Sequence, residues 1–539
     1  MAKLAIKPEN QKQSLLFPPC LDELIPETHM VRVVNEIIDR LDTSCLKESY
    51  KGGGNSCYSP RMMLKLLVYS YLNNVYSSRK IEQQIRENIN YMWLSGMSRP
   101  DFRTLNYFRG KRLKSKFESI FIQVVELLHS EGFLTLDVQY IDGTKIESAA
   151  NKYTFVWRKS IEKYDARLKA KTTAILERIE QSNGLESEEN PVNTSVTPEQ
   201  FRERVENIRQ KVEQDKLSKE DKKALREIEH EKLPKMDKYA LDLSIMGNRN
   251  SYSKTDPEAT FMRMKEDAML NGQLKAGYNV QISTENQFIT NYGIYQRPGD
   301  TLTLISYLET FKSRYGKQSS VIVADSGYGS EQNYEYMFGE NLMPYVKYNM
   351  FHKEQKRKYK NNPYLQANMY YNREQDYYVC PMGQHLEFIR QERRISESGY
   401  ESTLSLYRAR RCSGCPLRGG CHKSKRNRQM EVNHNLNALK QTACDLLMSQ
   451  AGMEHRSKRP IEPEAVFGHI KECGMFRRFR LRGIAGASLE FGLKALAHNL
   501  KKLAALTWAK LFACLFFPPK WMFTTKWNIV YNLRLPKVA

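Results

Sequence analysis

A short apolar run that ends in a carboxylate constrains this 539-residue chain more than any other feature. Residues 321–324 read Val-Ile-Val-Ala, a pattern typical of a buried strand, and Asp325 follows directly, with Ser-Gly-Tyr-Gly after it. A carboxylate at the end of a central strand is costly unless another group compensates its charge, and a bound divalent metal ion does so. The sequence therefore predicts a sheet with a metal-binding acid at the end of one strand.

A second strand pattern leads into an acid in the same way. Residues 138–141 read Val-Gln-Tyr-Ile, and Asp142 follows, ahead of Gly-Thr-Lys. If the two strands are neighbours, Asp142 and Asp325 lie close enough to share Mg²⁺, a hard cation that prefers oxygen ligands. Taken alone, either aspartate also fits the role of a turn or cap residue.

The order of the predicted elements favours a fold of the α+β or α/β class. From residue 134 the order is strand, strand, strand, helix, strand, helix, strand, with strand patterns at residues 134–148, 276–286, 287–297, 321–324 and 343–350. This order is typical of an RNase H-like mixed sheet with flanking helices. In such a sheet the first and fourth strands lie side by side, which would bring the two aspartates together.

Two helix-patterned regions accompany the predicted sheet. Residues 1–132 contain short helices with basic faces, one of which starts at Ser59-Pro60, and they suit an all-α DNA-binding domain; a plain helical bundle fits the same pattern. Residues 156–240 are charged and interrupted by one polar stretch, which predicts an inserted helical hairpin, either a solvated scaffold or a DNA clamp. The other predicted segments are the catalytic core at 133–155 and 241–350, a cysteine-rich insertion at 351–432, C-terminal core helices at 433–510 and a tail at 511–539.

Four of the ten cysteines form a metal-binding pattern. The last three of them follow C-x2-C-x5-C, and the four lie at Cys380, Cys412, Cys415 and Cys421. Thiolates at this spacing, beside turn-forming glycines, are typical of a structural zinc site with four protein ligands. His385 and His422 are substitute ligands, and four unrelated buried cysteines are the alternative explanation.

A third acid is expected on a helix late in the chain, because two-metal phosphoryl chemistry commonly uses three carboxylates. Residues 459–483 read RPIEPEAVFGHIKECGMFRRFRLRG, and Pro463 suits a helix start that places Glu464 and Lys471 on neighbouring faces. The rival third acids are Glu462, which also fits a helix-start charge, and Glu490, which also fits a solvated helix position.

The charge balance favours a polyanionic partner. Lys and Arg number 84 against 61 Asp and Glu, a formal net charge of +23, which favours nucleic acid or an anionic membrane. The longest apolar stretch, residues 503–517, contains Lys510 and is too short to span a bilayer, and no signal peptide is apparent. We therefore expect a cytoplasmic protein that binds nucleic acid and no membrane. The predicted phosphate contacts are Lys471, Arg477, Arg478, Arg480 and Arg482.

Together these motifs resemble those of bacterial insertion-sequence transposases of the DDE class. The resemblance covers residues 15 to 505 approximately and rests on YIDGTKIES, SKTDPEATFM, AGYNVQ, ADSGYGSEQN, the cysteine cluster, and EPEAVFGHIKECGMFRRFRLRG with FGLKALAHNLKK after it. It implies that Asp142, Asp325 and Glu464 are the three catalytic acids, and Lys471 fits the family's Glu-x6-Lys spacing. The family also has a Tyr-x2-Arg-x3-Glu pattern, through which the resemblance implies that Arg459 is a further DNA contact. Arg459 lies one residue farther from Glu464 than this pattern requires, and His455 and Arg456 lie near the expected position of its first part.

The resemblance also implies a chemistry and its partners. It implies cleavage and transfer of DNA strands with two Mg²⁺ or Mn²⁺ ions per site, one held by Asp142 and Asp325 and the other by Asp142 and Glu464. Double-stranded DNA, as element ends and target, is the expected partner, and joining two ends implies a homodimer or larger assembly. The family is bacterial, cytoplasmic and associated with the nucleoid. The alternatives are an RNase H-like nuclease that cuts without joining, and a decayed or domesticated DNA-binding protein.

Overall fold

The computed structural model describes residues 20–50, 56–184, 196–212, 217–264 and 273–516, and the chain divides into two compact units. The first unit comprises the residues up to Thr135 together with those from Phe491 onwards, and the second is Leu136–Glu490. The predicted tail at 511–539 lies mostly outside the described residues. The finer division into segments stays a prediction.

Every regular element in the described part of the first unit is a helix. The helices are α1 (Met30–Arg40), α2 (Ser44–Lys47), α3 (Pro60–Leu72), α4 (Ser78–Glu87), α5 (Ile89–Leu94), α6 (Phe102–Tyr107), a π-helical turn at Phe108–Leu113, α7 (Phe117–Ser130), and the part of α20 (Ile484–Phe516) that begins at Phe491. The predicted start of α3 is confirmed, since Ser59 Oγ accepts the Met62 N–H and Pro60 occupies the first turn. Helices α1 and α3 are linked by Lys65 Nζ, which donates to Asn35 at 2.7 Å and to Asp39 at 2.6 Å.

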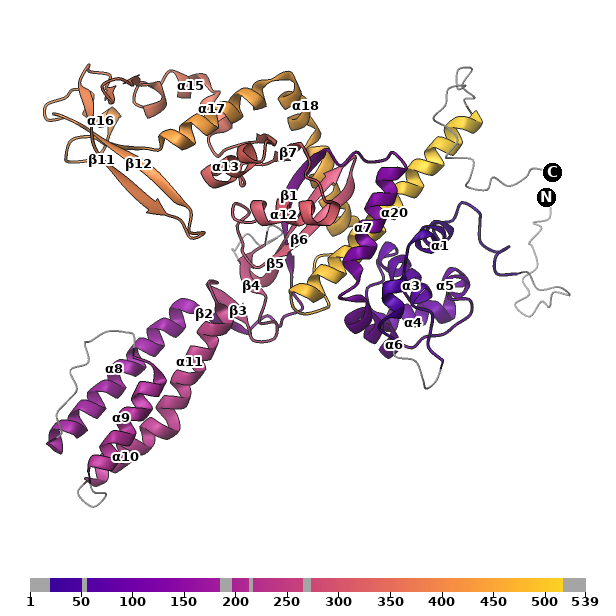
Figure 1. Ribbon diagram of the computed structural model, residues 1–539, viewed down its shortest axis with the longest axis horizontal. Helices are drawn as coiled ribbons and strands as arrows, with labels where there is room; N and C mark the ends of the chain where they lie inside the picture. The colour runs from indigo at the N-terminus through magenta and orange to yellow at the C-terminus, as the bar shows by residue number, and fades with distance from the viewer. Residues whose placement is uncertain (1–19, 51–55, 185–195, 213–216, 265–272, 517–539) are drawn as a thin grey trace, which may run out of the picture. The chain divides into compact units, whose positions relative to one another are not determined.

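A six-stranded mixed sheet lies at the centre of the second unit. Its strands follow the order β4 (Thr260–Arg263), β5 (Leu274–Glu285), β1 (Val138–Glu147), β7 (Val321–Ala324) and β8 (Met343–Val346), and β6 (Phe288–Tyr295) also pairs with β5 (Figure 1). Strand β1 runs antiparallel to β5 and parallel to β7. The first and fourth predicted strands are therefore neighbours, as the sequence indicated.

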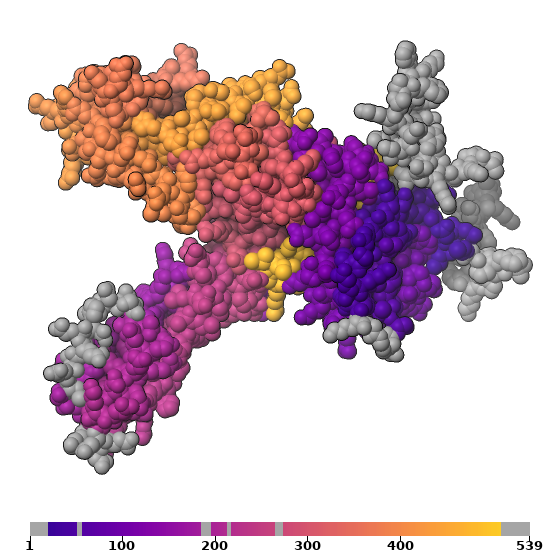
Figure 2. Space-filling view, in the orientation of Figure 1, coloured from indigo at the N-terminus to yellow at the C-terminus, as the bar shows by residue number. Residues whose placement is uncertain are grey.

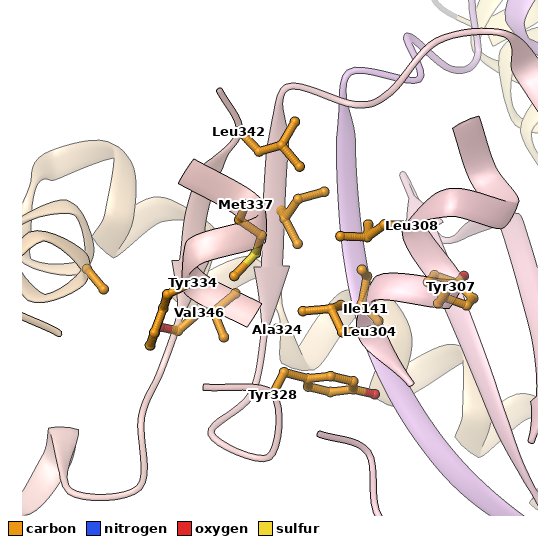
Figure 3. Close-up of a cluster of buried hydrophobic side chains, with 12 residues drawn as sticks. Ile141, Leu304, Tyr307, Leu308, Ala324, Tyr328, Tyr334, Met337, Leu342 and Val346 are labelled. Atoms are coloured by element: carbon orange, nitrogen blue, oxygen red, sulfur yellow. The ribbon is translucent and has the colours of Figure 1, made fainter. Parts of the chain in front are cut away.

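Helices cover both faces of this sheet. One face packs against α12 (Leu304–Tyr315) and α13 (Glu331–Gly339) through Ile141, Ile322, Ala324 and Val346 (Figure 3). The opposite face packs against α17 (His434–Met448) and Phe351 through Tyr140, Val321, Val323 and Tyr345. Because alternate residues of β7 are buried on opposite faces, the strand is apolar without interruption.

Strand β1 runs past Asp142, within the strand pattern predicted for residues 134–148. Asp142 was placed at its end, whereas β1 continues to Glu147 because its pairing with β5 extends to Glu147 and Gly277. Only the pairing with β7 stops early, at Tyr140 and Val323. Asp142 therefore lies inside one strand pair and just beyond the other, while Asp325 directly follows β7, as predicted.

The inserted hairpin is in fact a bundle of four helical segments. They are α8 (Arg158–Ser182), α9 (Pro198–Lys211), α10 (Lys219–Glu227) and α11 (Leu233–Met246), with a π-helical turn before α11 (Figures 1 and 2). They enclose an apolar core of their own, which includes Leu176, Phe201, Leu225 and Met236. The two-helix prediction was wrong because Ser218, whose hydroxyl accepts the Asp221 N–H at 3.0 Å, starts a new helix within the charged run. At the base of the bundle β2 (Phe155–Trp157) pairs with β3 (Ser251–Ser253).

A second sheet carries the cysteine-rich insertion. This antiparallel sheet has five strands, in the order β13 (Gln429–Val432), β12 (Glu401–Ala409), β11 (His385–Ile395), β10 (Tyr377–Val379) and β9 (Tyr370–Asn372). Cys380 and Cys412 pack against its small core, which includes Tyr378, Leu386 and Tyr407. Beyond β13, Asn433 and Asn435 donate to the Glu331 carboxylate of α13 at 2.6 and 2.9 Å.

After α17 the chain forms a nearly continuous helical run, and Pro463 lies inside it. Helix α18 (Gln450–Lys458) leads into a π-helical turn at Pro460–Glu464, then α19 (Ala465–Gly468) and a second π-helical turn at His469–Cys473. The prediction of a helix start at Pro463 was therefore wrong. Proline has no N–H and its ring crowds the preceding turn, and a widened π-helical turn accommodates both effects.

The glycines after Asp325 allow a close approach of two backbones. A Cβ on Gly329 would overlap the Lys347 carbonyl oxygen and lie 2.9 Å from Tyr348 Cα, just beyond the end of β8. Neither contact is with a flexible side chain. The loop that holds Asp325 therefore lies directly against the segment that follows β8.

We expect Gly329→Ala to lower the free energy of unfolding of the second unit by about 1–3 kcal/mol, because two backbone segments must separate. The matched control is Gly339→Ala at the end of α13, where an added Cβ meets no atom within 4 Å. That change should be neutral or stabilising by up to about 1 kcal/mol. Urea unfolding of both variants measures the difference, and equal stability would contradict the close packing.

Candidate active site

Asp142 and Asp325 project from the same face of the central sheet. The last parallel pair is Tyr140 and Val323; Asp142 comes two residues later on β1, and Asp325 comes two residues later, just beyond the end of β7. Side chains two residues apart along a strand point to the same face, here the one that α17 covers. The strand register alone thus places the two carboxylates side by side.

The two aspartates differ in their exposure. Asp142 is 8% exposed, in the middle of β1, whereas the side chain of Asp325 is 41% exposed. Asp325 Oδ1 accepts the Gly327 N–H at 2.8 Å, and this hydrogen bond orients the carboxylate at the end of its strand. One carboxylate is therefore fixed by the sheet and the other by its own loop.

One guanidinium joins the third predicted acid to these two. Arg459 Nη2 lies 3.2 Å from Asp142 Oδ1 and 3.7 Å from Asp325 Oδ2, and its Nη1 lies 2.6 Å from Glu464 Oε1. Arg459 is 8% exposed, and its Nε is buried with no hydrogen-bond partner among the described residues. Asp142, Asp325 and Glu464 therefore converge on a single buried cation.

The segment that carries Glu464 follows β1 along its length. Tyr140 Oη lies 2.9 Å from His455 Nδ1, Lys471 Nζ donates to the Lys145 carbonyl at 3.1 Å, and the Phe479 N–H donates to the Glu147 carbonyl at 2.8 Å. Burial raises the pKa of Tyr140 to about 12 and lowers the pKa of His455. A protonated phenol therefore donates to a neutral imidazole at the start of this contact.

The rival third acids both accept backbone hydrogen bonds. Glu490 is fully buried and accepts the N–H groups of Arg480 and Leu481 at 2.6 and 2.8 Å, so the expectation of a solvated position was wrong. Glu462 is also buried and accepts the Gln287 N–H at 2.7 Å. These contacts favour structural roles for both residues and leave Glu464 as the acid beside the aspartates.

The predicted phosphate contacts fall into two groups. Lys471 is buried against the Lys145 carbonyl, Arg477 pairs with Glu472, and Arg478 donates to the carbonyls of Ser148 and Ala150. Arg459 belongs with them because it binds the three acids. Arg480 and Arg482 have exposed side chains, as Arg477 and Arg478 also do. The first group binds the protein's own groups in this structure, and a DNA contact stays a prediction for all six.

The sequence analysis missed two residues beside the acids. Lys347 directly follows β8, and the pKa of its ammonium is lowered by burial and by the charges of Arg459 and Arg456. Asp300 Oδ1 accepts hydrogen bonds from Asn279 and Gln281 of β5 at 2.7 and 2.8 Å. The rule that singled out Asp325 also applies to Lys347, since each follows one of two adjacent parallel strands.

The motif SKTDPEATFM supports the arginine-rich segment from behind. Asp256 is fully buried, and its Oδ1 accepts the Tyr278 hydroxyl and the Gly483 N–H, both at 3.0 Å. Burial raises the pKa of this carboxyl. Glu258 accepts the Ile484 N–H at 2.7 Å, so the motif satisfies backbone donors where α20 begins.

The three carboxylates have the chemistry of a divalent-metal site but not its arrangement. Carboxylate oxygens are the ligands that Mg²⁺ and Mn²⁺ prefer. Within the described ranges, however, no group of three or more His, Cys, Asp or Glu side chains is arranged to hold a metal ion. The guanidinium of Arg459 lies among the three acids instead. The donor set therefore fits the metal, provided that this side chain moves.

The four cysteines of the predicted zinc site line one cavity of about 20 Å³, together with His422. All four are free thiols, and both ring nitrogens of His422 are buried without a described hydrogen-bond partner. The Arg428 N–H and Nη1 donate to Cys412 Sγ and Cys421 Sγ at 3.4 and 2.9 Å. This donor set fits zinc, although the cysteines, too, are not arranged around an ion.

Two family models match the chain. Residues 19–111 match the family described as Transposase domain (DUF772), and residues 379–504 match the Transposase DDE domain. The second match contains Glu464 and the four cysteines, while Asp142 and Asp325 lie outside it. No curated protein and no solved structure matches the chain. None of the described helices is both long and apolar enough to cross a membrane.

The contacts of Glu490 and Glu464 predict losses of stability of different size. We expect Glu490→Ala to lower the free energy of unfolding by about 3 kcal/mol, because two backbone N–H groups lose their acceptor in the interior. Glu464→Ala removes a half-exposed partner of Arg459 and should cost less than about 1 kcal/mol. Urea denaturation of both variants makes the comparison, and an undisturbed Glu490→Ala protein would return Glu490 to the candidates for the third acid.

Proposed function

Because the chain belongs to the insertion-sequence transposases of the DDE class, we propose that it cuts DNA at the ends of its element and joins the freed strands to a target. The observation that carries this proposal is the convergence of Asp142, Asp325 and Glu464 on Arg459. Three carboxylates from two adjacent strands and a later helical segment match the three acids that the family resemblance assigned. The strand order β6-β5-β1-β7-β8 supports an RNase H-like fold for this domain.

In this proposal the three carboxylates hold Mg²⁺ or Mn²⁺. When bound, two such ions supply an activated oxygen nucleophile and neutralise the charge that develops on the leaving oxygen. Asp142 would be the fixed ligand, since β1 is held between two strands. Asp325 is oriented by the Gly327 N–H, and Glu464 is the most exposed of the three, which leaves it free to adjust.

The proposed partner is double-stranded DNA, as the element's ends and as the target. The net charge of +23 and the exposed side chains of Arg480 and Arg482 supply attraction for phosphates. The helical first unit, which contains the matched transposase domain, would bind the ends. Joining two ends requires that they meet, so a dimer or larger assembly in the bacterial cytoplasm, at the nucleoid, belongs to the proposal.

We also propose that the cysteine-rich insertion binds one structural zinc ion. Cys380, Cys412, Cys415 and Cys421 would be the ligands, with His422 as a substitute for one of them. The support comes from the shared cavity and from the unsatisfied ring nitrogens of His422. A zinc ion would tie the loop before β11 to the segment after β12, where the small core of this sheet ends.

The main test is cleavage of supercoiled DNA that carries the element's ends, with Mg²⁺ or Mn²⁺. We expect Asp142→Asn, Asp325→Asn and Glu464→Gln each to lower the cleavage rate by about a hundredfold or more while DNA binding is retained. Asp137→Asn is the matched control, because this exposed acid directly precedes β1 and should leave cleavage unchanged.

Each other outcome of this test identifies a rival function. Cutting without joined products indicates an RNase H-like nuclease. Binding of the ends with no cutting in either metal indicates a DNA-binding protein without catalysis. Full activity of the Glu464→Gln variant would remove this residue from the proposed site.

The zinc proposal predicts one zinc ion per chain when the protein is purified without chelators. Cys412→Ser and Cys415→Ser should each lower the content to below about a fifth of an ion, because zinc needs all of its ligands. The control is Cys57→Ser, an exposed cysteine of the first unit, which should keep the wild-type content. Elemental analysis gives the values, and a wild-type protein free of zinc would contradict the proposal.

A further inference from the structure

Arg459 supplies one positive charge to the three acids that the proposed function assigns to a metal. Its guanidinium makes an ion pair with each of Asp142, Asp325 and Glu464, and the residue is almost fully buried. A guanidinium keeps its proton at any physiological pH, so this positive charge disappears from the site only if the side chain moves. Three neighbouring carboxylates repel one another in its absence, and Arg459 therefore stabilises their present arrangement.

The carboxylate oxygens that contact Arg459 are also the ones that would bind a divalent cation. Asp142 is the most buried of the three acids, and its Oδ1 is the atom that Arg459 Nη2 contacts. A metal held by Asp142 and either of the other acids would have to share this space with the guanidinium. Two cations in contact repel strongly where water is excluded, so binding of the metal and the present position of Arg459 oppose each other.

Arg459 also lies beside other cations. The ammonium of Lys347 has its pKa lowered by burial, by Arg459 and by Arg456, so these three charges are close neighbours. Arg456 Nε is buried without a hydrogen-bond partner among the described residues. These three cations would attract a polyanion. A phosphate can accept two parallel hydrogen bonds from one guanidinium. A DNA phosphate is thus the ligand best suited to draw Arg459 away from the acids.

Arg459 stands at a point where the helical run changes its hydrogen bonding. It caps the end of α18, and Pro460 starts the π-helical turn that contains Glu464. The backbone there departs from the regular α-helical ladder, a feature that often accompanies functional sites. A movement of the Arg459 side chain would therefore occur next to Glu464, one of the acids that this movement releases.

We infer that Arg459 is a resident counter-ion that couples metal binding to DNA binding. In this scheme, which rests on the proposed function, Arg459 occupies the acids when no DNA is bound, and duplex DNA withdraws its guanidinium and so raises their affinity for the metal. The coupling is reciprocal, because a ligand shifts an equilibrium by its difference in affinity for the two states: the metal must strengthen DNA binding by the same factor. Arg459 is then a positioning residue, and its replacement should uncouple metal binding from DNA binding.

The test measures Mn²⁺ binding directly, by the electron paramagnetic resonance signal of free Mn²⁺, with the full chain. The DNA is a pre-cleaved duplex of the element's end whose 3′ terminus is a dideoxynucleotide, so that it cannot be joined, and DNA alone is titrated to subtract its own binding. We expect the wild type to bind Mn²⁺ at least tenfold more tightly with this DNA than without it. Arg459→Gln should bind Mn²⁺ tightly without DNA, and DNA should change its affinity by less than twofold.

Two variants keep the result interpretable. Arg390→Gln, an exposed arginine of β11 that pairs with Glu392, should keep the wild-type coupling. Arg459→Lys keeps the charge but loses the planar guanidinium, and its coupling should lie between those of the wild type and of Arg459→Gln. This variant replaces Arg459→Gln in the test if Arg459→Gln does not fold. In EDTA, Arg459→Gln should unfold at a lower temperature than the wild type, and Mn²⁺ should raise the unfolding temperature of the variant to that of the wild type.

The inference is overturned if the wild type binds Mn²⁺ equally well with and without DNA, or if Arg459→Gln keeps the full effect of DNA. Failure of the proposed function looks different: Mn²⁺ binding in the presence of DNA would then be unchanged by Asp142→Asn. Binding that requires Asp142 but responds neither to DNA nor to Arg459 refutes the counter-ion scheme alone.

Discussion

The parallel pairing of β1 with β7 is the interaction on which the candidate active site depends. Its last pair, Tyr140 with Val323, determines that Asp142 and Asp325 lie next to each other on one face. A shift of one residue would turn one of the carboxylates to the opposite face, where α12 and α13 pack. The apolar residues of both strands prevent that shift, because each face of the sheet is buried against helices. The core therefore sets the geometry of the acids before any ligand is present.

Strand β1 also positions the third acid, at a distance of more than three hundred residues along the chain. Contacts at Tyr140, Lys145 and Glu147 hold the segment from His455 to Phe479 along the strand. Buried carboxylates complete this support by accepting backbone N–H groups, Glu462 from the loop before β6 and Glu490 from the arginine-rich segment. Several acids and cations that look functional in the sequence thus bind the protein's own groups in this structure.

The sequence was sufficient for features with a local cause. Asp325 after an apolar strand, the order of strands and the start of α3 each depend on neighbouring residues, and the structure bears them out. The burial of Glu490 and the position of Arg459 among the acids could not be predicted, since both arise from contacts between distant segments. Asp142 shows the limit between the two cases: its neighbours indicate a strand end, but β5 extends the strand past it. The strand pattern of residues 134–148 reaches past Asp142, but it does not show which strand pairs there.

Both insertions leave the β1–β7 pairing undisturbed because each has its own core and closes its own base. The helical bundle begins and ends at the β2–β3 pair, where Phe155 lies opposite Ser253, so its two ends are adjacent despite nearly a hundred residues between them. Once the ends of a loop are fixed together, additional length costs little free energy. The cysteine-rich sheet rejoins the core where Asn433 and Asn435 bind Glu331 on α13, a helix that packs on the face opposite the acids. The fold can therefore contain both insertions while the three carboxylates keep the spacing that β1 imposes.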